Sequence, residues 1–425
     1  MRDPLDVWVY GTRIATITED PNGRLFLSWT TEAEDRWASQ VRILSAKLTI
    51  GVRPVPALVK AYLDGLLPEG NARANHAMSA GVSPDDTFAL IRSYGRDTPG
   101  AAIFVPEGTA DPTTSGYYEP LDSDEVAHRI RYADEHSPSD QFGVTAESSS
   151  LPGMVPKIAL HRIGETWQAC KAGAPSTWII KRGSSPESGI ADVIDTEAAS
   201  LELAHRVGLT TVDTEILEYE DVRAIAISRY DRGPGEARIH QEDLAQAVGL
   251  NTSDPNRRFQ WGSKLPTLRH AAEVLREDGG NPDDLLRLVT FSHIVGNTDM
   301  HAKNISFIRR ADGSVTLSPA YDISMHLHHR RDNRRFALDV NGKFLVDEVT
   351  IDDVVAEGRS WGLPERRAIR VVNRTLSQVA EAFSAIDRSA HPGVSAEAWD
   401  LVEKRVHDAL VWDLDRVSPS RPKLR

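Results

Sequence analysis

Residues 296–304 read GNTDMHAKN, and the pair YD follows at residues 321–322. Asp299 stands five residues before Asn304, and Asp322 comes later in the chain. Phosphoryl transfer needs a carboxylate that accepts the proton of the attacking hydroxyl, and oxygen ligands for the magnesium ion that bridges the phosphates. A loop that offers Asp299 and Asn304 together, with Asp322 as a second metal ligand, is therefore typical of a phosphotransfer site.

The same three residues also have a plainer interpretation, because Asp and Asn are common in turns and at helix ends. The apolar run from Leu285 to Val295 predicts a helix, so a turn is needed after it in any case. Taken singly, each residue favours this structural interpretation. Their joint spacing favours the catalytic one.

Short apolar and aromatic runs predict strands in the first half of the chain, and helical periodicity dominates the second half. Strands are expected at residues 7–10, 13–18, 25–27, 157–161, 178–181, 214–219 and 222–228, and helices at 55–67, 123–136 and 195–207. Further helices are expected at 241–248, 285–295, 364–386 and 394–414, interrupted by a hairpin of residues 304–309 and 315–317. Strands first and helices second predict an α+β fold.

The composition along the chain suggests the domain boundaries. Residues 106–150 are rich in Pro, Gly, Ser, Thr and Asp, which indicates loops and a linker around one charged helix. With 425 residues, the chain is long enough for several packed units. We expect a mixed N-terminal subdomain at 1–108, a linker with a helix at 109–147, a strand-rich lobe at 148–235 and a helical lobe at 236–425.

The charge balance restricts the classes of partner. With 49 Lys and Arg against 62 Asp and Glu, the net charge of −13 argues against a surface that binds nucleic acid or anionic membranes as a whole. Cys170 is the one cysteine, which excludes an intramolecular disulfide and fits a reducing compartment. The N-terminus lacks the apolar run of a signal peptide, and no apolar stretch approaches the roughly 18 residues of a membrane span. We expect a cytoplasmic protein without a membrane partner.

Five motifs carry a specific resemblance. They are YLDGLLPE at 62–69, DTPGA at 97–101, QED at 241–243, TDMHAKN at 298–304 and AYDI at 320–323. In this order they resemble the HipA family, serine/threonine kinases of bacterial toxin–antitoxin systems, and the likeness covers nearly the whole chain. It implies a two-lobed protein-kinase-like fold with a β-rich N-lobe, an all-helical C-lobe and a small mixed α/β N-terminal subdomain of the HipA type.

The resemblance implies ATP and Mg²⁺ as cofactors. It implies that Asp299 is the catalytic base and that Asn304 and Asp322 are the magnesium ligands. The residues that it implies lie along the bound nucleotide are His301, Ala302, Lys303, Asn304, Tyr321 and Asp322. The match of STWIIK at 176–181 brings Lys181 to the α- and β-phosphates, where Glu197 of the next helix could hold it. By residue type alone, Lys181 would be a strand-end lysine that extends to solvent.

Two further segments are assigned to ATP by the resemblance. The segment that joins the lobes and offers backbone groups to adenine contains Ser228, Arg229 and Tyr230, although the family often has an acidic residue at the first of these. A loop over the phosphates contains Pro152, Gly153, Met154, Val155, Pro156 and Lys157. On composition alone this loop is a linker, because its two prolines lack the N–H groups that could bind phosphate.

Ser150 lies just before the predicted phosphate loop, where the resemblance implies autophosphorylation. A phosphate on Ser150 would repel the phosphates of ATP and expel the loop, which would switch the enzyme off. This hypothesis depends on the family likeness.

The run HLHHRRDNRR at residues 326–335 is the conspicuous basic cluster of the chain. Three histidines and one aspartate could bind a metal ion, but repulsion by four arginines disfavours a bound cation. A solvated loop is the plainer interpretation. A third possibility is recruitment of an acidic or tRNA-bearing protein substrate, because kinases keep a substrate-facing segment after the acid that corresponds to Asp322.

The function that the resemblance implies is that of a protein-kinase toxin which phosphorylates serine or threonine. Its implied partners are a HipB-like DNA-binding antitoxin, through which any DNA contact would be indirect, and a protein substrate such as an aminoacyl-tRNA synthetase. Two alternatives remain open at this point. The scaffold could serve a kinase of small molecules or lipids, or a non-catalytic pseudokinase that binds a partner, although the complete set of Lys181, Asp299, Asn304 and Asp322 argues against the latter.

Overall fold

The computed structural model describes residues 2–114, 116–133, 151–152, 157–185, 188–219, 222–251, 266–329 and 334–417. The chain forms two compact units. The strand-rich unit comprises Met1–Arg182, Glu215–Leu265 and Ser306–Ser318, and the helical unit comprises Gly183–Thr214, Pro266–Ile305 and Pro319–Arg425. Together they have the α+β, kinase-like architecture that the sequence predicts.

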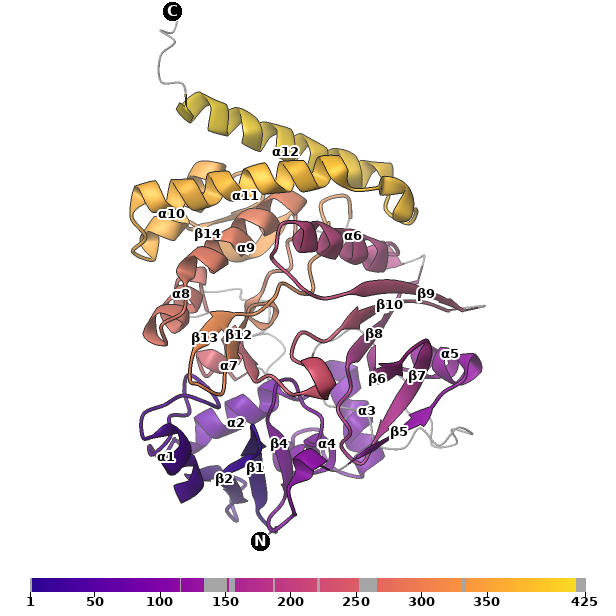
Figure 1. The fold of residues 1–425 in the computed structure, drawn as a ribbon, viewed down its shortest axis with the longest axis vertical. Coiled ribbons are helices and arrows are strands. Elements are labelled where there is room, and N and C mark those ends of the chain that lie inside the picture. The colour runs from indigo at the N-terminus through magenta and orange to yellow at the C-terminus, as the bar shows by residue number, and fades with distance from the viewer. Residues whose placement is uncertain are drawn as a thin grey trace, which may run out of the picture. The chain divides into compact units, whose positions relative to one another are not determined.

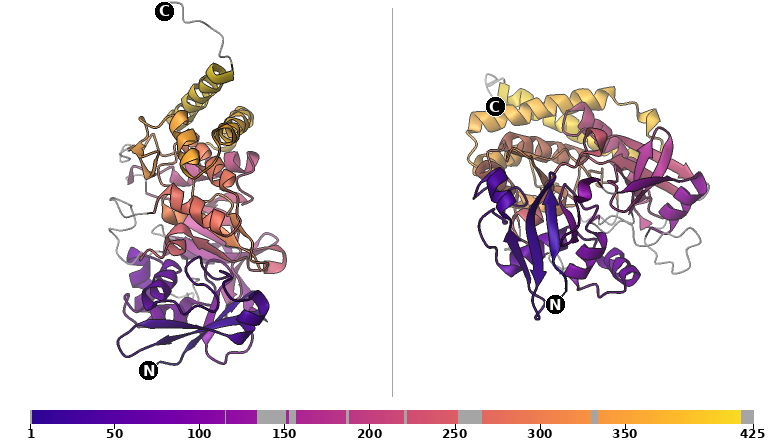
Figure 2. Two further views of the ribbon diagram at one scale, coloured as in Figure 1. Left: turned by 90° about the vertical axis from the view of Figure 1, so that its left-hand side faces the viewer. Right: turned by 60° about the horizontal axis from the view of Figure 1, so that its bottom comes forward.

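The first sheet of the strand-rich unit has the order β3-β2-β1-β4, and its strands run side by side in the right-hand view of Figure 2. These strands are β1 (Leu5–Val9), β2 (Thr12–Glu19), β3 (Leu25–Trp29) and β4 (Ile103–Pro106). Four helices accompany the sheet, namely α1 (Thr31–Trp37), α2 (Pro56–Gly65), α3 (Gly70–Ala80) and α4 (Thr87–Tyr94). Alternating residues such as Leu5, Val7 and Val9 are buried against Tyr62 and Leu63 of α2, so the sheet and helices share one core.

The second sheet has the order β5-β7-β6-β8-β10-β9. It consists of β5 (Tyr117–Pro120), β6 (Lys157–Ile163), β7 (Thr166–Lys171), β8 (Trp178–Arg182), β9 (Thr214–Tyr219) and β10 (Val222–Ser228). The predicted strands 214–219 and 222–228 are confirmed residue for residue, and the predicted turn at 220–221 lies outside the described residues. Helix α5 (Ser123–Arg131) begins at a capping box of Asp122 and Glu125 and buries Val126 and Ile130 in the core of this sheet (Figure 1).

The stretch interpreted as a linker at 109–147 contributes one strand, β5, to this second sheet. Strand β5 pairs antiparallel with β7, from Tyr117 opposite Lys171 to Pro120 opposite Gln168. The helix predicted there is confirmed as α5, but the strand was not expected. Strand β5 has four residues and ends in a proline, so its sequence does not indicate a strand. It is an edge strand because it pairs with β7.

A third, three-stranded sheet of the strand-rich unit has the order β11-β12-β13. It consists of β11 (Gln241–Asp243), β12 (Ser306–Arg309) and β13 (Val315–Leu317), and α7 (Leu244–Ala247) follows β11. The prediction of a helix from residue 241 is wrong for its first three residues, because Gln241 pairs with Ile308 of β12. The predicted hairpin is confirmed, but it lies in the strand-rich unit, although the sequence analysis assigned it to the helical lobe.

The helical unit contains α6 (Val193–Arg206), α8 (Leu268–Glu277), α9 (Pro282–Val295), α10 (Ile351–Ser360), α11 (Glu365–Ala385) and α12 (Ala396–Val417). Figure 1 shows α11 and α12 side by side, in yellow. Val372, Leu376, Val379 and Phe383 recur at helical spacing on α11 and are buried, as predicted for a core-facing stripe. This unit also holds a small hairpin of β14 (Arg335–Val340) and β15 (Lys343–Leu345), so it is predominantly rather than entirely helical. Within the described part of the chain, no helix has both the length and the apolar character to cross a membrane.

Candidate active site

Helix α9 leads into the loop that the sequence analysis assigned to catalysis. The side chain of Asn281 accepts a hydrogen bond from the backbone N–H of Asp283, and Pro282 occupies the first helical turn. The helix ends at Gly296, whose φ of 73° is in the left-handed region. A Cβ atom there would lie 2.5 Å from the side chain of Leu327. Both the backbone conformation and the close approach of Leu327 therefore require a glycine where the loop begins.

Residues 297–304, hereafter the Asp299 loop, are held by hydrogen bonds to the backbone of Asp299. Its N–H donates to Oδ1 of Asn297 at 3.2 Å, and its carbonyl accepts from the N–H of His301 and from Nδ2 of Asn304, both at 2.8 Å. The side chain of Asp299 is 52% exposed, with Nε2 of His301 3.9 Å from one carboxylate oxygen. The loop thus fixes the backbone of Asp299 and leaves its carboxylate open to an incoming group.

The end of the Asp299 loop is a 3₁₀ turn, η5 (Ala302–Asn304). Nδ1 of His301 accepts from the N–H of Lys303 at 3.2 Å, and the N–H of Asn304 donates to the carbonyl of His301 at 2.9 Å. Ala302 and Asn304 are buried. The bond to the carbonyl of Asp299 uses the Nδ2 end of the Asn304 amide, so it does not occupy Oδ1, the atom that a magnesium ion would bind.

Tyr321 connects the second predicted segment to the Asp299 loop. Its hydroxyl donates to the carbonyl of Lys303 at 2.7 Å. The next residue, Asp322, has a φ of 55°, which is uncommon for a residue other than glycine. Such conformations concentrate at functional sites, where the surrounding contacts maintain them. The structure therefore brings Asp299, His301, Lys303, Asn304 and Tyr321 into one hydrogen-bonded group, with Ala302 in its turn and Asp322 adjoining it in the chain.

Two contacts outside the predicted set hold the start of the loop. Nδ1 of His326 accepts from the N–H of Thr298 at 3.3 Å, and the carbonyl of Thr298 accepts from the N–H of Ala337 at 2.9 Å. The sequence analysis missed these supports, and it also missed the role of Asn297 in holding the N–H of Asp299. Nothing distinguishes such residues in the sequence, because their importance comes from backbone groups that only the folded chain brings near.

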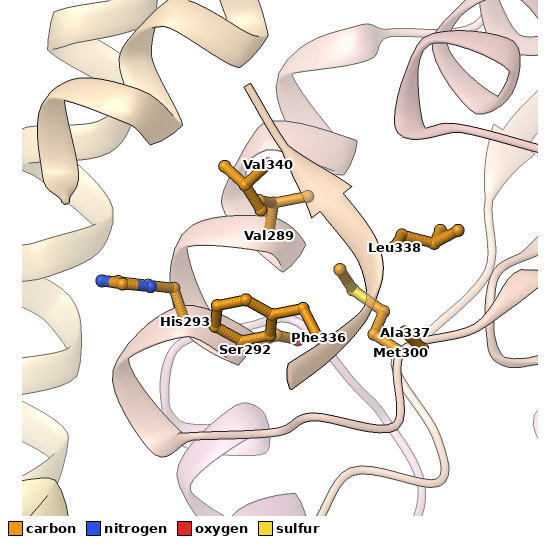
Figure 3. Close-up of a pocket in the computed structure, with 8 residues that line it drawn as sticks. All are labelled: Val289, Ser292, His293, Met300, Phe336, Ala337, Leu338 and Val340. Atoms are coloured by element: carbon orange, nitrogen blue, oxygen red, sulfur yellow. The ribbon is translucent and has the colours of Figure 1, made fainter. Parts of the chain in front are cut away.

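Met300 anchors the middle of the loop in a small, mainly apolar pocket. Figure 3 shows its side chain among residues of α9 and β14. The other residues that line the pocket are Val289, Ser292, His293, Phe336, Ala337, Leu338 and Val340. Because Met300 is buried between two exposed or partly exposed neighbours, Asp299 and His301, it directs both of their side chains away from the core.

The predicted phosphate-binding lysine lies in the second sheet of the strand-rich unit. Lys181 is buried on β8, and the pairing of β6 with β8 places Lys157 directly opposite it. Nζ of Lys157 donates to the carbonyl of Pro152 at 2.9 Å. Directly opposed residues of an antiparallel pair lie on the same face, so the two lysines share one face of the second sheet. Glu197 is buried on α6, in the helical unit.

The segment predicted to contact adenine follows β10. Ser228 is the last residue of that strand, the N–H of Arg229 donates to the carbonyl of Thr177 at 2.8 Å, and the hydroxyl of Tyr230 donates to Oε1 of Gln241 at 2.9 Å. The predicted phosphate-loop residues Gly153 to Pro156, the predicted autophosphorylation site Ser150 and the arginines at 330 and 331 lie outside the described residues.

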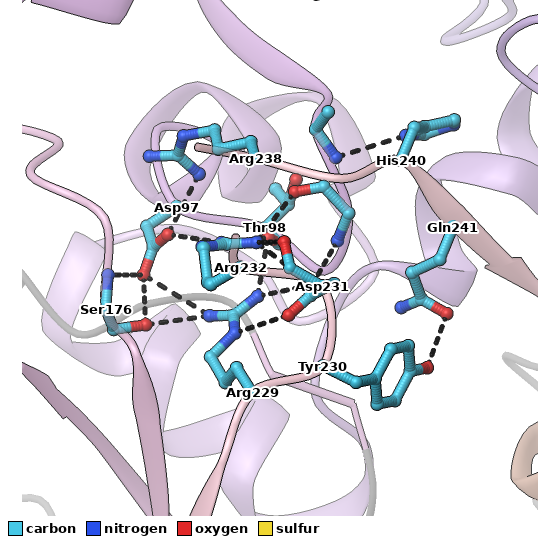
Figure 4. Close-up of polar contacts among 12 residues, drawn as sticks. Asp97, Thr98, Ser176, Arg229, Tyr230, Asp231, Arg232, Arg238, His240 and Gln241 are labelled. Atoms are coloured by element: carbon cyan, nitrogen blue, oxygen red, sulfur yellow. Dashed lines mark hydrogen bonds and ion pairs between the residues drawn. The ribbon is translucent and has the colours of Figure 1, made fainter. Parts of the chain in front are cut away.

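Arg229 belongs to a group of buried charges, hereafter the buried ion network, that Figure 4 shows. Its members are Asp97, Ser176, Arg229, Asp231, Arg232 and Arg238. Arg229 donates two hydrogen bonds to Asp231, at 2.9 and 2.8 Å. Asp97 accepts from Arg232 at 2.8 Å, from Arg238 at 2.9 Å and from the hydroxyl of Ser176 at 2.6 Å.

The buried ion network joins the N-terminal subdomain to the second sheet within the strand-rich unit. The N–H of Gly100 donates to Asp231 at 2.6 Å, and Gly100 has a φ of 82°. Burial raises the pKa of Asp97, but the three arginines lower it more, to about 2. Asp231 also has a pKa below its usual range, because Arg229 and Arg232 outweigh the effect of burial. The side chain of Arg229 is therefore structural.

A strand-rich unit, a helical unit and a loop with the Asp–Asn spacing define a protein-kinase-like protein. Residues 5–105 match the HipA N-terminal domain, and residues 149–383 match the HipA-like C-terminal domain. The chain therefore belongs to the HipA family, as the sequence motifs predict.

The relatives agree with this assignment. The serine/threonine-protein kinase toxin HipA of Shewanella oneidensis is 26% identical over 343 residues, which cover 77% of each chain. A putative kinase of Sinorhizobium fredii is 28% identical over 400 residues, which cover 89% of this chain and 91% of that one. A chain of the solved complex of HipA, HipB and operator DNA from Shewanella oneidensis superposes with a TM-score of 0.79 at 24% identity, covering 98% of this chain and 100% of that one, which supports the fold.

Proposed function

We propose that the protein is an ATP- and Mg²⁺-dependent serine/threonine-protein kinase that acts as the toxin of a toxin–antitoxin system. The observation that carries the proposal is the Asp299 loop, in which the backbone of Asp299 is fixed by Asn297 and Asn304 while its carboxylate is half exposed. A general base must be held in one place and yet be reachable by the proton it accepts. The family membership and the kinase names of the relatives support the same activity.

In the proposed reaction, Asp299 accepts the proton of a serine or threonine hydroxyl. The hydroxyl oxygen forms a bond to the γ-phosphorus of ATP while the bond from that phosphorus to the β,γ-bridging oxygen breaks, and ADP leaves. Oδ1 of Asn304 and the carboxylate of Asp322 would bind magnesium, because carboxylate and amide oxygens are the ligands this ion prefers. The bound ion would neutralise the negative charge on the phosphates.

Lys181 and Lys157 are assigned to the phosphates of ATP. Their opposed positions on β8 and β6 concentrate positive charge on one face of the second sheet. Backbone groups of residues 228–230 are assigned to adenine. The side chain of Arg229 takes no part in this, because it is committed to Asp231.

The biological setting of the proposal comes from the relatives. A HipA of Shewanella oneidensis was solved with HipB and operator DNA, and a similar DNA-binding antitoxin is proposed for this chain, with DNA contact only through it. The proposed substrate is a protein, for which an aminoacyl-tRNA synthetase is the first candidate. Autophosphorylation of Ser150 is proposed as the means of switching the enzyme off, and mass spectrometry after incubation with ATP tests it, since an unmodified Ser150 would exclude it.

The decisive experiment follows the fate of the γ-phosphate. Purified protein and its Asp299→Asn variant are incubated with γ-labelled ATP and cell extract, and labelled bands are identified by mass spectrometry. We expect a labelled protein that is absent with the variant, and phosphoserine or phosphothreonine in it. Label that appears only in small molecules would favour the alternative of a small-molecule or lipid kinase. If no molecule were labelled, and calorimetric titration of the protein with ATP and Mg²⁺ gave no heat of binding, the alternative of a pseudokinase would be supported.

A further inference from the structure

Two adjacent histidines of the helical unit converge on one carboxylate. Nε2 of His328 lies 2.8 Å from one oxygen of Asp192, and Nε2 of His329 lies 2.7 Å from the other. The three ligand atoms all lie within 4.8 Å of one another. From the sequence alone, a metal site formed by the histidines and the aspartate within residues 326–335 is disfavoured. The structure instead supplies the carboxylate from a segment more than a hundred residues earlier in the chain.

The cluster is enclosed but reachable. The side chains of His328 and His329 are 8% and 5% exposed, whereas that of Asp192 is 20% exposed. Among the described residues, the buried Nδ1 atom of His328 has no hydrogen-bond partner. In the hydrogen-bonded contact, Nε2 of His328 therefore carries the proton that Asp192 accepts, and a metal ion on Nε2 would shift that proton to Nδ1. Neutral imidazole is the form that binds metal ions.

The charge at the cluster also suits a cation. Both oxygens of the Asp192 carboxyl group face imidazole nitrogens, at 2.8 Å from His328 and 2.7 Å from His329, so an acidic ligand lies between the two rings. The nearest described arginine in the sequence, Arg334, donates to both oxygens of Asp347. Its charge is thus partly neutralised, which reduces the repulsion that the sequence analysis expected.

We propose that Asp192, His328 and His329 form a binding site for a zinc-type divalent cation, with two imidazole nitrogens and one carboxylate oxygen as ligands. Tetrahedral ligands at about 2.0–2.1 Å from Zn²⁺ lie about 3.3 Å from one another. The nitrogen–oxygen distances of 2.7 and 2.8 Å would need to lengthen by about half an ångström to reach this separation. Water completes the coordination at the exposed side of Asp192. Imidazole ligands favour zinc over magnesium, so this site differs in chemistry from the proposed Mg²⁺–ATP site.

The position of the cluster gives the ion a structural role within the helical unit. Asp192 immediately precedes α6, and the two histidines follow Asp322 in the segment whose His326 holds the N–H of Thr298. A bound ion would replace two hydrogen bonds by three metal–ligand bonds. It would thereby fix the segment after Asp322 to the start of α6 and stabilise the fold.

A metal titration with matched variants tests the site. Tag-free full-length protein is titrated with Zn²⁺ against a competing chelator, and with Co²⁺ while the visible absorption is recorded, both in excess Mg²⁺. We expect one equivalent of Zn²⁺, the intense visible bands of tetrahedral Co²⁺, and a rise in Tm with Zn²⁺. His329→Asn and Asp192→Asn should lose all three. His391→Asn should keep them, because His391 also pairs with a carboxylate, Glu202 at 2.7 Å, but without a second imidazole.

Several outcomes would overturn the site. If wild type and His329→Asn bound Zn²⁺ equally well, the ion would be bound by other histidines on the surface. Absence of binding by wild-type protein with a native near-ultraviolet circular dichroism spectrum would leave a metal-free hydrogen-bonded contact. Because these readouts do not require phosphotransfer, they separate failure of the metal site from failure of the proposed function.

Discussion

The Asp299 loop and the buried ion network use the same residue type in opposite ways. Asp97 and Asp231 are 7% and 4% exposed, and every carboxylate oxygen of the pair accepts at least one hydrogen bond or ion pair. The side chain of Asp299 is 52% exposed, and within the described residues its ion-pair neighbour is His301, at 3.9 Å. In the Asp299 loop, hydrogen bonds hold the backbone of Asp299 and not its carboxylate.

The difference separates structural from functional acids. A carboxylate that is saturated by arginines stabilises the fold only while its partners are present, and it has no capacity left for a proton or a substrate. When hydrogen bonds fix only the backbone of an aspartate, its carboxylate can still accept a proton. Substitutions in the two regions should therefore affect different properties, stability in one and activity in the other.

The largest expected effect is on phosphotransfer. Asp299→Asn keeps the shape of the side chain but removes the base, so we expect the rate to fall by about 10²- to 10⁴-fold. Unfolding by urea should be unchanged, because the carboxylate makes no buried contact. Glu273→Gln, which changes an exposed carboxylate on α8, serves as the matched control and should retain full activity. Full activity of Asp299→Asn would remove the basis of the comparison.

The second effect is on stability. Asp231→Asn removes the nearer of the two carboxylates that pair with the buried Arg229 and leaves Asp97 at 3.6 Å, and removing one partner of a buried pair costs about 3–5 kcal/mol. The urea midpoint should fall accordingly. Glu218→Gln, which breaks the exposed contact with Arg223 in the same unit, should leave the midpoint nearly unchanged. A near-neutral Asp231→Asn would mean that the buried ion network is not what joins the N-terminal subdomain to the second sheet.

The Asp299 loop can be recognised in the sequence more easily than the buried ion network, because its residues are close together in the chain. The Asp299 loop is local, so its spacing of Asp and Asn is visible in nine consecutive residues. The network gathers Asp97, Ser176 and residues 229–238 from distant segments, and a charged residue normally indicates an exposed position. The charge of Arg229 thus indicates an exposed side chain, whereas that side chain is buried against Asp231.

The same distinction explains the errors in the fold. Strands β9 and β10 have enough alternating residues to be predicted correctly, whereas β5 and β11 have four and three residues and exist because β7 and β12 pair with them. The contact of His328 and His329 with Asp192 is equally invisible, since no local pattern connects residues so far apart in the chain. Local chemistry can be predicted from this sequence, and long-range pairing cannot.

A smaller effect separates the two roles of Asn304 in the loop. Asn304→Ala removes both the hydrogen bond to the carbonyl of Asp299 and the proposed magnesium ligand, and we expect a loss of about 10²-fold in rate. Asn304→Asp keeps an oxygen ligand and loses only the Nδ2 donor. It should therefore retain more activity than Asn304→Ala and show a similar dependence on Mg²⁺ to wild type. If the two variants were equally impaired, the hydrogen bond rather than the ligand would be the important contribution.

The smallest expected effect is a loss of folding stability at low pH, which we attribute to Asp97 of the buried ion network. Burial raises the pKa of Asp97, but Arg229, Arg232 and Arg238 together bring it to about 2, below the ordinary value of 3.8. Because the folded state binds this proton less readily than the unfolded chain, the contribution of Asp97 is fully present above pH 3.8 and is lost as the pH falls towards 2.

Comparison of wild type with Asp97→Asn isolates this contribution, since the other carboxylates titrate in both proteins. The difference in free energy of unfolding should be constant from neutral pH down to about pH 5 and should shrink as the pH falls from about 4 towards 2. A difference between wild type and Asp97→Asn that grew on acidification would mean that Asp97 is protonated in the folded protein, and that the arginines of the network do not hold its charge.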